Sequence, residues 1–538
     1  MNESACGPSE ARPASAKATA VRRSFSEGGS RRARASDSLE LPRARPRERR
    51  ALGGGAPSAL RNGGAPRALR NAGRCYKLAA AFAIILCSLI LPLHAQEKPQ
   101  EPKQSPPPAG APKDFTIPTP RRFTLANGLP VTLVPFGQVP KVNIRLVVEA
   151  ANLHEKKNEV WLADLTGSLM REGTTALSAE AVAREFASMG GELGISVGPD
   201  TTSISSDVLS DRGPDAIRLI ADVAQRPRLP ESEIDRLKSD LLRTLSIQRS
   251  TPQSIAQEKF SELLYGDHPY GRVFPDEATL KAYTIEQVKV FHRSNYGAGR
   301  ARLYVAGVFD AKAMETAIRQ AFETWDRGSA ADQAKVPAPG GTRFGLIDRP
   351  DAPQSTLMLG LRVPDPSHKD WVPLQVTDAL LGGAFGSRIT SNIREQKGYT
   401  YSPFSTVQTH PKQAHWVETA DVTTKVTGES LKEIFFEVDR LRKEAPPAGE
   451  LRGIQNNLAG IFVVQNASRS GVISRLAFVD QHGLGDEYLS TYVKQVMAVT
   501  PADVQRVASE YLVPDKMTLV VVGDVKTVKE QVIPWAAR

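Results

Sequence analysis

One pattern occurs twice in this chain and restricts the possible fold more than any other feature. "TIEQVKVFHRSNYGAGRARLYVAGVFD" begins at Thr284, and "TPADVQRVASEYLVPDKMTLVVVGDV" begins at Thr500. Each segment has the pattern of an amphipathic helix, a tyrosine, a short loop and an apolar strand that ends at Gly307 or Gly523. Both the threonines and the glycines are 216 positions apart. A repeat of this length indicates two similar domains.

The rest of each repeat alternates between strand and helix patterns. An Asn-Gly turn at Asn127 and Gly128 joins two short strands, and "VNIRLVVEA" alternates as a further strand. A long helix is expected after Pro230. The predicted fold class is therefore α+β, with two duplicated α/β-sandwich domains at residues 119–330 and 343–538. The segment "GSAADQAKVPAPGG" is expected to link them.

The N-terminal part differs in composition from these domains. Residues 1–75 are rich in Arg, Gly, Pro and Ala and lack apolar periodicity, so they are expected to be disordered or to be untranslated upstream sequence. Residues 76–95 contain the uncharged "LAAAFAIILCSLILPLHA", which is typical of a signal peptide cleaved after Ala95 or kept as an N-terminal membrane anchor. Residues 96–118 read as a Pro-rich linker. The expected location is the periplasm.

The excess of positive charge is confined to that N-terminal part. Residues 1–75 carry sixteen basic and six acidic side chains, and this difference equals the net charge of +10 of the whole chain. The charge of the folded part gives no reason to expect a nucleic-acid partner. The three cysteines, Cys6, Cys75 and Cys87, all precede the expected cleavage site. An exported chain would therefore contain neither a disulfide nor a thiolate metal site.

Three stretches occur together in the order and spacing of one known family. They are "LLYGDHPYGR" at 263–272, the repeated closing element, and "GGAFGSRITSNIREQKGYTYS" at 382–402. With them the chain resembles the pitrilysin or insulinase-type metallopeptidases, which include the mitochondrial processing peptidases, over nearly all of residues 119–538. The resemblance implies two α+β domains that make half of a clamshell. Two such halves would enclose a chamber in which an unfolded peptide is cleaved.

The resemblance also implies where the family's zinc chemistry should lie. Family members carry H-x-x-E-H on a helix of the first domain, and a later helix supplies a further glutamate. The two histidines and the later glutamate bind zinc, while the motif glutamate takes a proton from the attacking water. In this chain the matching helix is "VWLADLTGSLMREGTT", anchored by Gly173. The ligand positions then hold Asp164, Ser168 and Thr244, and the base position holds Gly167. No metal is expected in this chain.

The other histidines do not complete such a motif. His154 lies with two glutamates in a polar, loop-like stretch, which we interpret as solvated surface. His410 and His415 are five positions apart with a proline between them, so they are expected in a strand or turn. His268 is expected to make a structural hydrogen bond. A metal-ligand role is the less favoured alternative for each.

The glycine-rich start of 382–402 suggests a phosphate or a peptide ligand. A phosphate-binding loop would place Lys and then Ser or Thr after its last glycine, and this segment lacks that lysine. The resemblance implies instead a flexible loop with which non-catalytic processing-peptidase subunits hold substrate. The residues at these positions are Gly382, Gly383, Gly386 and Arg388.

Arg394 and Tyr401 match the family's second-domain signature, an arginine and a tyrosine seven positions apart. A guanidinium and a phenol can both donate hydrogen bonds to a peptide carbonyl and stabilise the charge that develops on it during hydrolysis. The alternative is that Arg394 only pairs with an acid such as Glu395 and that Tyr401 only packs. Tyr399 competes for the tyrosine role because it directly follows a glycine.

The residues at the substrate side are thus kept, and those at the zinc side are not. In bacterial members of the family these two roles can be divided between two chains. The first hypothesis is a non-catalytic, substrate-binding subunit of a periplasmic heterodimeric zinc peptidase that hydrolyses short or unfolded peptides. A paralogous partner would hold the zinc, and this chain alone would be inactive. The alternatives are a structural or assembly protein without a proteolytic role, and a self-sufficient peptidase with another metal site.

Overall fold

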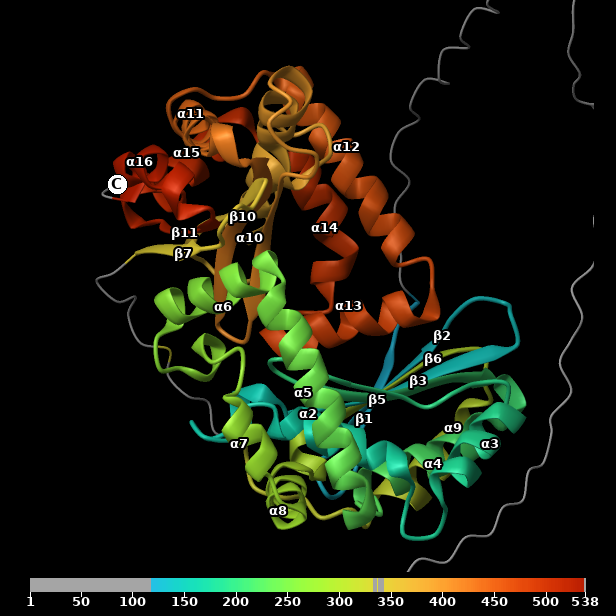
Figure 1. The fold of residues 1–538 in the computed structure, drawn as a ribbon. Helices are drawn as coiled ribbons and strands as arrows, with labels where there is room; N and C mark the ends of the chain where they lie inside the picture. The colour runs from blue at the N-terminus through green and yellow to red at the C-terminus, as the bar shows by residue number, and fades with distance from the viewer. Residues whose placement is uncertain (1–117, 332–335, 337–342, 537–538) are drawn as a thin grey trace, which may run out of the picture. The chain divides into compact units, whose positions relative to one another are not determined.

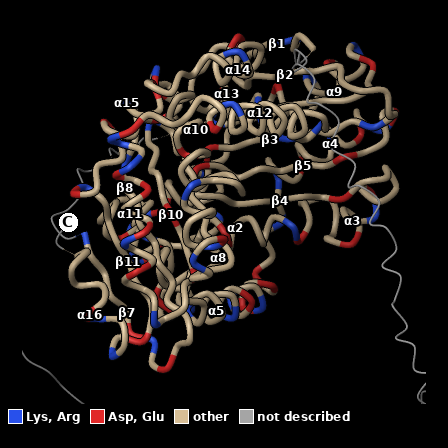
Figure 2. The backbone as a smooth tube through the Cα atoms, turned by 90° about the horizontal axis from the view of Figure 1, so that it is seen from above, with Lys and Arg blue, Asp and Glu red and all other residues tan. Residues whose placement is uncertain are grey.

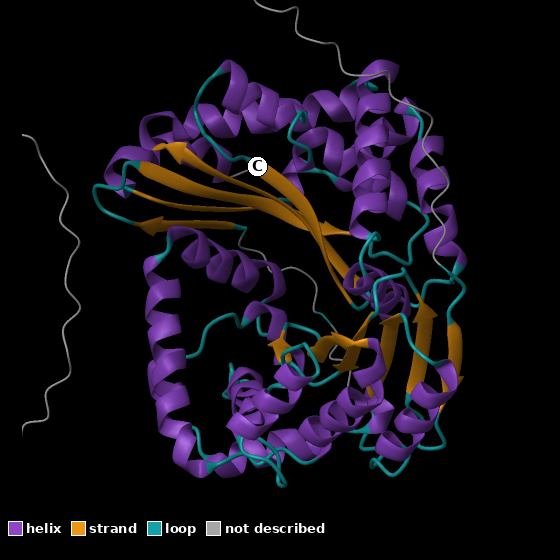
Figure 3. Cartoon of the chain, turned by 90° about the vertical axis from the view of Figure 1, so that its right-hand side faces the viewer, coloured by secondary structure: helices purple, strands orange, loops and turns teal. Residues whose placement is uncertain are grey.

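The computed structural model describes residues 118–331, 336 and 343–536, which form two sheets covered by helices (Figures 1 and 3). The predicted disordered segment 1–75, signal peptide 76–95 and nearly all of the linker 96–118 lie outside the described residues. No helix within the described ranges is both long enough and apolar enough to cross a bilayer. Basic and acidic residues are both spread over the described chain (Figure 2).

The first sheet has the strand order β1-β2-β6-β3-β5-β4. Strand β6 is parallel to β2 and antiparallel to β3, and β5 is antiparallel to both β3 and β4. The strands are β1 (Arg121–Thr124), β2 (Pro130–Pro135), β3 (Lys141–Val148), β4 (Gly194–Val197), β5 (Thr202–Leu209) and β6 (Ala301–Gly307).

The second sheet repeats this arrangement without the extra strand β1. Its order is β7-β11-β8-β10-β9, with a parallel pair β7 and β11 and antiparallel pairs elsewhere. The strands are β7 (Phe344–Asp348), β8 (Gln354–Val363), β9 (Phe404–His410), β10 (Gln413–Thr423) and β11 (Thr518–Gly523). The predicted α+β class with two duplicated units is confirmed by this shared topology.

Helices cover both sheets, and the helix of each repeated segment, α8 or α15, is among them. The first unit contains α2 (Leu162–Leu169), α3 (Ala179–Ser188), α4 (Gly213–Gln225), α5 (Ile234–Ser250), α6 (Pro252–Tyr265), α7 (Glu277–Ala282), α8 (Ile285–Asn295) and α9 (Ala311–Phe322). The second contains α10 (Trp371–Asp378), α11 (Thr427–Lys443), α12 (Ala448–Gln465), α13 (Arg469–His482), α14 (Glu487–Ala498), α15 (Pro501–Tyr511) and α16 (Val525–Ala536). Two π-helical turns, Ala379–Gly383 and Thr390–Gln396, follow α10.

The two repeated segments adopt the same local structure. Helices α8 and α15 both begin with a capping box, in which Thr284 or Thr500 accepts a hydrogen bond from the third helical residue and that residue's side chain bonds back. Each helix precedes an apolar interior strand of its sheet, β6 or β11. The sequence pattern at 284 and 500 therefore sets the same helix start and the same core strand in both units.

One helix of each unit packs against the sheet of the other unit. Helix α6 of the first unit packs on the second sheet, where Phe260 is buried in one cluster with Met358 and Val520. Helix α13 of the second unit packs on the first sheet, and its Ile473 shares a buried cluster with Tyr304. Figure 1 shows α13 beside β2 and β6, and α6 beside the second sheet. The sequence prediction of two domains with separate boundaries did not include this exchange.

Polar contacts fix the exchanged helix α13. The guanidinium of Arg469 donates to both carboxyl oxygens of Asp207 on β5, at 3.0 Å each. The Tyr304 hydroxyl on β6 donates to Asp480 on α13 at 2.7 Å. These contacts join residues more than 170 positions apart in the sequence, so they depend on the packed fold.

Candidate functional site

The four positions at which the family carries its zinc chemistry do not form a metal site here. Asp164 on α2 is partly buried, and its Oδ2 accepts a hydrogen bond from Asn152 Nδ2 at 2.8 Å. Burial raises the pKa of this carboxyl group. Thr244 on α5 is exposed, and its hydroxyl donates to the backbone oxygen of Asp240. One carboxyl group and two hydroxyls are a poor donor set for zinc, which prefers histidine, cysteine and carboxylate ligands.

Packing leaves no room for a side chain at Gly167, the position at which the family carries its catalytic glutamate. A Cβ atom at Gly167 would lie 2.6 Å from Cγ2 of Val197 on β4. A glutamate therefore cannot replace Gly167 unless Val197 moves. Within residues 118–331 and 343–536 there is no group of three or more His, Cys, Asp or Glu side chains placed to hold a metal ion. The described residues thus do not fit zinc, and no catalytic step through a metal can be assigned to them.

The loop around His154 is not the solvated surface that the sequence predicts. Glu155 is buried, and its carboxyl group accepts hydrogen bonds from the backbone N–H groups of Trp161 and Ala163 and from Asn152 Nδ2. The two backbone donors lie at the start of α2, so Glu155 satisfies N–H groups at the N-terminus of that helix. The polar composition of the loop does not indicate this contact, because Glu155 precedes the first residue of α2 by seven positions.

The histidine pair lies where the sequence predicts, in a strand and its turn. His410 ends β9, and its Nδ1 lies 2.9 Å from Asp200 Oδ2. His415 on β10 is buried, and its Nδ1 lies 2.7 Å from the Tyr265 hydroxyl. Burial lowers the pKa of His415 to about 3, so this ring is neutral. His268 accepts a hydrogen bond from the Tyr270 N–H, as its predicted structural role requires.

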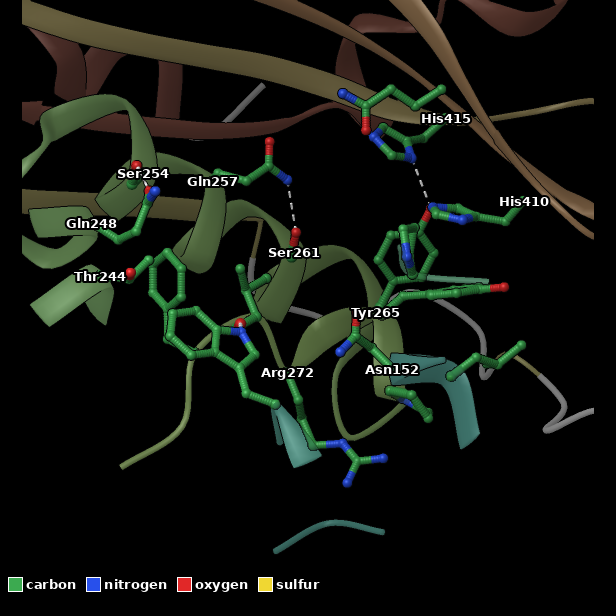
Figure 4. A pocket seen from close by; sticks show the side chains of 18 residues that line it. Asn152, Thr244, Gln248, Ser254, Gln257, Ser261, Tyr265, Arg272, His410 and His415 are labelled. Atoms are coloured by element: carbon green, nitrogen blue, oxygen red, sulfur yellow. Dashed lines mark hydrogen bonds between the residues drawn. The ribbon is translucent and has the colours of Figure 1, made fainter. Parts of the chain in front are cut away.

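Both histidines line a cavity of about 430 Å³ between α5, α6 and the β9–β10 hairpin (Figure 4). Thr244, one of the lost zinc positions, lies on its wall with Gln248 and Gln257. In Figure 4 the amide of Gln257 is bonded to the Ser261 hydroxyl. The walls are therefore mostly neutral polar groups and aromatic rings, which can accommodate a peptide chain.

The glycines at the start of the segment 382–402 differ in the space around them. A Cβ at Gly382 would lie 2.5 Å from Ser405 Oγ and 2.6 Å from Glu418 Oε2, and one at Gly383 would lie 2.8 Å from Asp378 Oδ2. A Cβ at Gly386 would have no neighbouring atom within 4 Å. Close packing thus explains the first two glycines without a ligand, and only Gly386 lies in open space.

Arg388 has a partner inside the fold that the sequence did not suggest. It is 7% exposed, and its Nε and Nη2 atoms donate to the two carboxyl oxygens of Glu450 at 2.7 and 2.8 Å. Glu450 lies in the first turn of α12. This bidentate pair gives Arg388 a structural contact between the glycine-rich segment and α12, and it leaves little of the guanidinium exposed to a substrate.

The structure brings Arg394 and Tyr401 side by side at the surface. The guanidinium carbon of Arg394 lies 4.9 Å from the ring centre of Tyr401 and 4.5 Å from that of Phe385. Tyr401 is 78% exposed and Phe385 is 76% exposed. The predicted alternative partner is also present, because Arg394 Nε lies 3.2 Å from Glu395. Tyr399 instead packs against the core of the second unit, so it does not compete for the place beside Arg394.

Phe385 is the residue of this site that sequence reasoning missed. It is a large aromatic residue between the glycines of the segment, and that composition was the available signal. A guanidinium over an aromatic face gains on the order of 0.5–1 kcal/mol at an exposed site. Two such contacts hold the Arg394 side chain between two rings.

Comparisons with known proteins agree with this fold. The model of the insulinase family, peptidase family M16, matches residues 136–275, and that of the peptidase M16 inactive domain matches residues 282–458. An uncharacterized zinc protease of Rickettsia felis is 28% identical over 280 residues, covering 52% of this chain and 67% of that protein. An uncharacterized zinc protease of Mycobacterium tuberculosis is 25% identical over 411 residues, covering 73% of this chain and 91% of that protein.

Solved structures are similar over the same part of the chain. A peptidase M16 inactive domain from Pseudomonas fluorescens superposes with a TM-score of 0.70 and is 26% identical, covering 75% of this chain and 98% of that one. A protease from Helicobacter pylori has a TM-score of 0.69 at 22% identity, covering 76% of this chain and 100% of that one. The second similarity is one of fold alone.

Proposed function

Because the chain belongs to the insulinase-type peptidase family M16, we propose that it is a non-catalytic, substrate-binding subunit of a heterodimeric zinc peptidase. Its partner would be a paralogous chain that carries H-x-x-E-H, and the substrate would be a short or unfolded peptide. The observation that carries this proposal is the contact of Arg394 with the exposed Tyr401, in a chain that has one carboxyl group and no histidine at the family's zinc-ligand positions.

The chemistry of Arg394 suits a role toward a peptide carbonyl. Its guanidinium carbon lies 4.5 Å from the ring centre of Phe385 and 4.9 Å from that of Tyr401, and its Nε is paired with Glu395. The two terminal NH2 groups at its edge can then donate to a carbonyl oxygen. The Tyr401 hydroxyl offers a further donor. Charge-assisted donors of this kind stabilise the negative charge that develops when a peptide bond is attacked.

The test is a reconstitution assay with a zinc-motif chain. Residues 96–538 would be purified alone, assayed for zinc content and for cleavage of a fluorogenic unfolded peptide, and then mixed with a candidate partner. We expect neither zinc nor cleavage alone, and cleavage in the mixture. Arg394→Ala is expected to lower the rate of the mixture by about 10²–10³. The matched control is Arg218→Ala on α4, an exposed arginine paired with Asp215, which should leave the rate unchanged.

Two results would contradict the proposal. Near-stoichiometric zinc with cleavage by the isolated chain would identify a self-sufficient peptidase. A stable complex without any peptide cleavage or peptide binding would favour the structural or assembly role.

Export to the periplasm is a part of the proposal that rests on residues 76–95 alone. The pattern of a basic flank, an apolar core and a small residue at position 95 supports it. Cell fractionation with N-terminal sequencing of the mature chain tests it. A mature N-terminus near residue 96 is expected, and an intact N-terminus in the membrane fraction would show an anchor instead.

A further inference from the structure

Two carboxyl groups lie directly against the backbone of the glycine-rich segment. Asp378 ends α10, and Glu418 lies on β10. The π-helical turn Ala379–Gly383 passes so close to them that side chains at Gly382 and Gly383 would lie within 2.6 Å of Glu418 Oε2 and 2.8 Å of Asp378 Oδ2. The turn therefore rests on the two carboxyl groups without an intervening side chain.

The two carboxyl groups differ in their hydrogen bonds. Asp378 Oδ1 accepts from the Ser405 hydroxyl at 2.6 Å and from the Trp416 indole N–H at 2.8 Å. Glu418 is 1% exposed, and neither of its carboxyl oxygens has a side-chain hydrogen-bond partner in the described chain. A buried carboxylate without such donors is costly, whereas a neutral carboxylic acid is much less so.

The surroundings of Glu418 favour its neutral form. Burial and the neighbouring Asp378 raise the pKa of Glu418 well above its ordinary value, and the Phe404 backbone offsets part of this effect. Burial also raises the pKa of Asp378 to about 6. Asp378 is the titratable side chain that acts on Glu418, and the other groups from β9 and β10 around the pair, Ser405 and Trp416, are neutral. Two carboxylates in one buried site disfavour each other's charge.

The turn leads directly to the proposed substrate site. Phe385 follows Gly383 by two residues, and its ring lies 4.5 Å from the Arg394 guanidinium. Because Phe385 is 76% exposed, few contacts apart from Arg394 hold its ring in place. The position of Phe385 therefore depends on the turn before it, and the turn depends on the carboxyl groups below it.

We propose that Glu418 and Asp378 are positioning residues for this segment, and that Glu418 must carry its proton for the turn Ala379–Gly383 to hold Phe385 against Arg394. When Glu418 loses its proton, a buried anion lies against the backbone of Gly382 and beside Asp378. Water must then reach it, and the turn must move away. The consequence for peptide binding rests on the proposed function, while the change in the turn does not.

The direction in which pH changes the stability of the turn follows from the protonation of Glu418. A carboxyl group whose pKa is higher in the closed turn than in the open one stabilises the closed turn at low pH, and this stabilisation is lost as the pH rises. The glutamine in Glu418→Gln cannot ionise and has nearly the same shape, so this variant should keep the turn closed at the pH values at which Glu418 would lose its proton.

The experiment is hydrogen exchange of the amides of residues 379–387 in the full chain between pH 5.5 and 9, corrected for the intrinsic pH dependence of exchange. Protection in the wild type is expected to fall at least tenfold over this range, and Glu418→Gln is expected to lose the part of this fall that lies above the pKa of Asp378, about 6. Glu185→Gln, which alters an exposed glutamate on α3 of the other unit, is the control and should keep the wild-type profile. Equal protection at all pH values in the wild type, or a wild-type profile in Glu418→Gln, would overturn the proposal.

A second measurement is infrared spectroscopy. A buried, protonated carboxyl group gives a C=O stretching band at neutral pH, and the wild-type chain is expected to show such a band that is absent from Glu418→Gln, in addition to any band from Glu155. Absence of that band would overturn the proposal. Binding of a fluorescent unfolded peptide, followed over the same pH range, separates the two proposals. A pH-dependent turn with no peptide binding at any pH would contradict the proposed function and leave the role of Glu418 standing.

Discussion

Gly382 and Gly386 belong to the same glycine-rich segment, but their surroundings differ. A side chain at Gly382 would meet Ser405 and Glu418 at 2.5–2.6 Å, whereas a side chain at Gly386 would meet nothing within 4 Å. Neither glycine has a positive φ angle. Any cost of substitution therefore comes from space and not from backbone conformation.

This difference predicts opposite results for two alanine variants. Gly382→Ala should lower the free energy of unfolding by about 1–3 kcal/mol, because overpacking of a buried site costs that much. Gly386→Ala should change it by less than about 0.5 kcal/mol, as surface substitutions do. Urea unfolding of both variants beside the wild type checks this. Equal stability of Gly382→Ala and wild type would mean that the turn adapts more easily than its contacts indicate.

Gly167 provides a second prediction at the scale of single residues. Replacing Asp164, Gly167, Ser168 and Thr244 by the family's His, Glu, His and Glu is expected to give no stoichiometric zinc binding, because Val197 occupies the space of the new glutamate. Adding Val197→Ala should relieve the clash and raise the zinc content measured by atomic absorption. Zinc binding that is the same with valine and with alanine at position 197 would show that β4 moves to make room for the glutamate introduced at Gly167.

At the scale of elements, helix α2 depends on a carboxyl group that precedes it. Burial is the main cause that raises the pKa of Glu155 to about 8, although hydrogen bonds from Ala163, Trp161 and Asn152 act against it. The folded state therefore binds this proton more tightly than the unfolded state does. Stability from Glu155 is present at low pH and is lost as the pH rises from the ordinary glutamate pKa toward 8.

We expect the free energy of unfolding to fall between pH 5 and pH 8, with a slope that reflects this group. One pKa unit corresponds to about 1.4 kcal/mol, so the loss should amount to a few kcal/mol. In Glu155→Gln this part of the pH dependence should vanish. Denaturant unfolding at both pH values provides the measurement, and an unchanged slope in the variant would assign the dependence to other groups.

At the scale of the whole molecule, the exchange of α6 and α13 makes the two units one folding unit. Phe260 from α6 is buried against the second sheet, and Ile473 from α13 is buried against the side of the first sheet that carries Tyr304. Separation of the units would expose both buried surfaces to water, at a cost of roughly 25 cal/mol for each Å² of apolar surface.

Residues 118–331 and 343–538 produced separately are therefore expected to remain largely unfolded or to aggregate. Mixed or co-expressed, they should recover native circular dichroism and a single unfolding transition. The intact chain should likewise unfold in one step. Two folded, monomeric halves with independent transitions would show that the exchanged helices contribute less than their burial indicates.

Features that depend on neighbours in the chain could be predicted from the order of the residues alone. The repeat at Thr284 and Thr500 predicted two units with the same closing helix and strand, because helix caps and apolar periodicity are local properties. The loss of zinc ligands at Asp164, Ser168 and Thr244 could also be read directly, since it concerns residue types. So could the candidate pair Arg394 and Tyr401.

How these elements pack against one another could not be predicted in this way and is visible only in the folded chain. The exchange of α6 and α13, the pairing of Arg388 with Glu450, the burial of Glu155 and the position of Glu418 beneath Gly382 all depend on surfaces that are distant in sequence. The side chains of Arg388, Glu155 and Glu418 are ionisable, and such residues are ordinarily found at the surface. Their burial follows from the space and the hydrogen-bond donors that the packed elements provide, and a linear pattern of residue types contains neither.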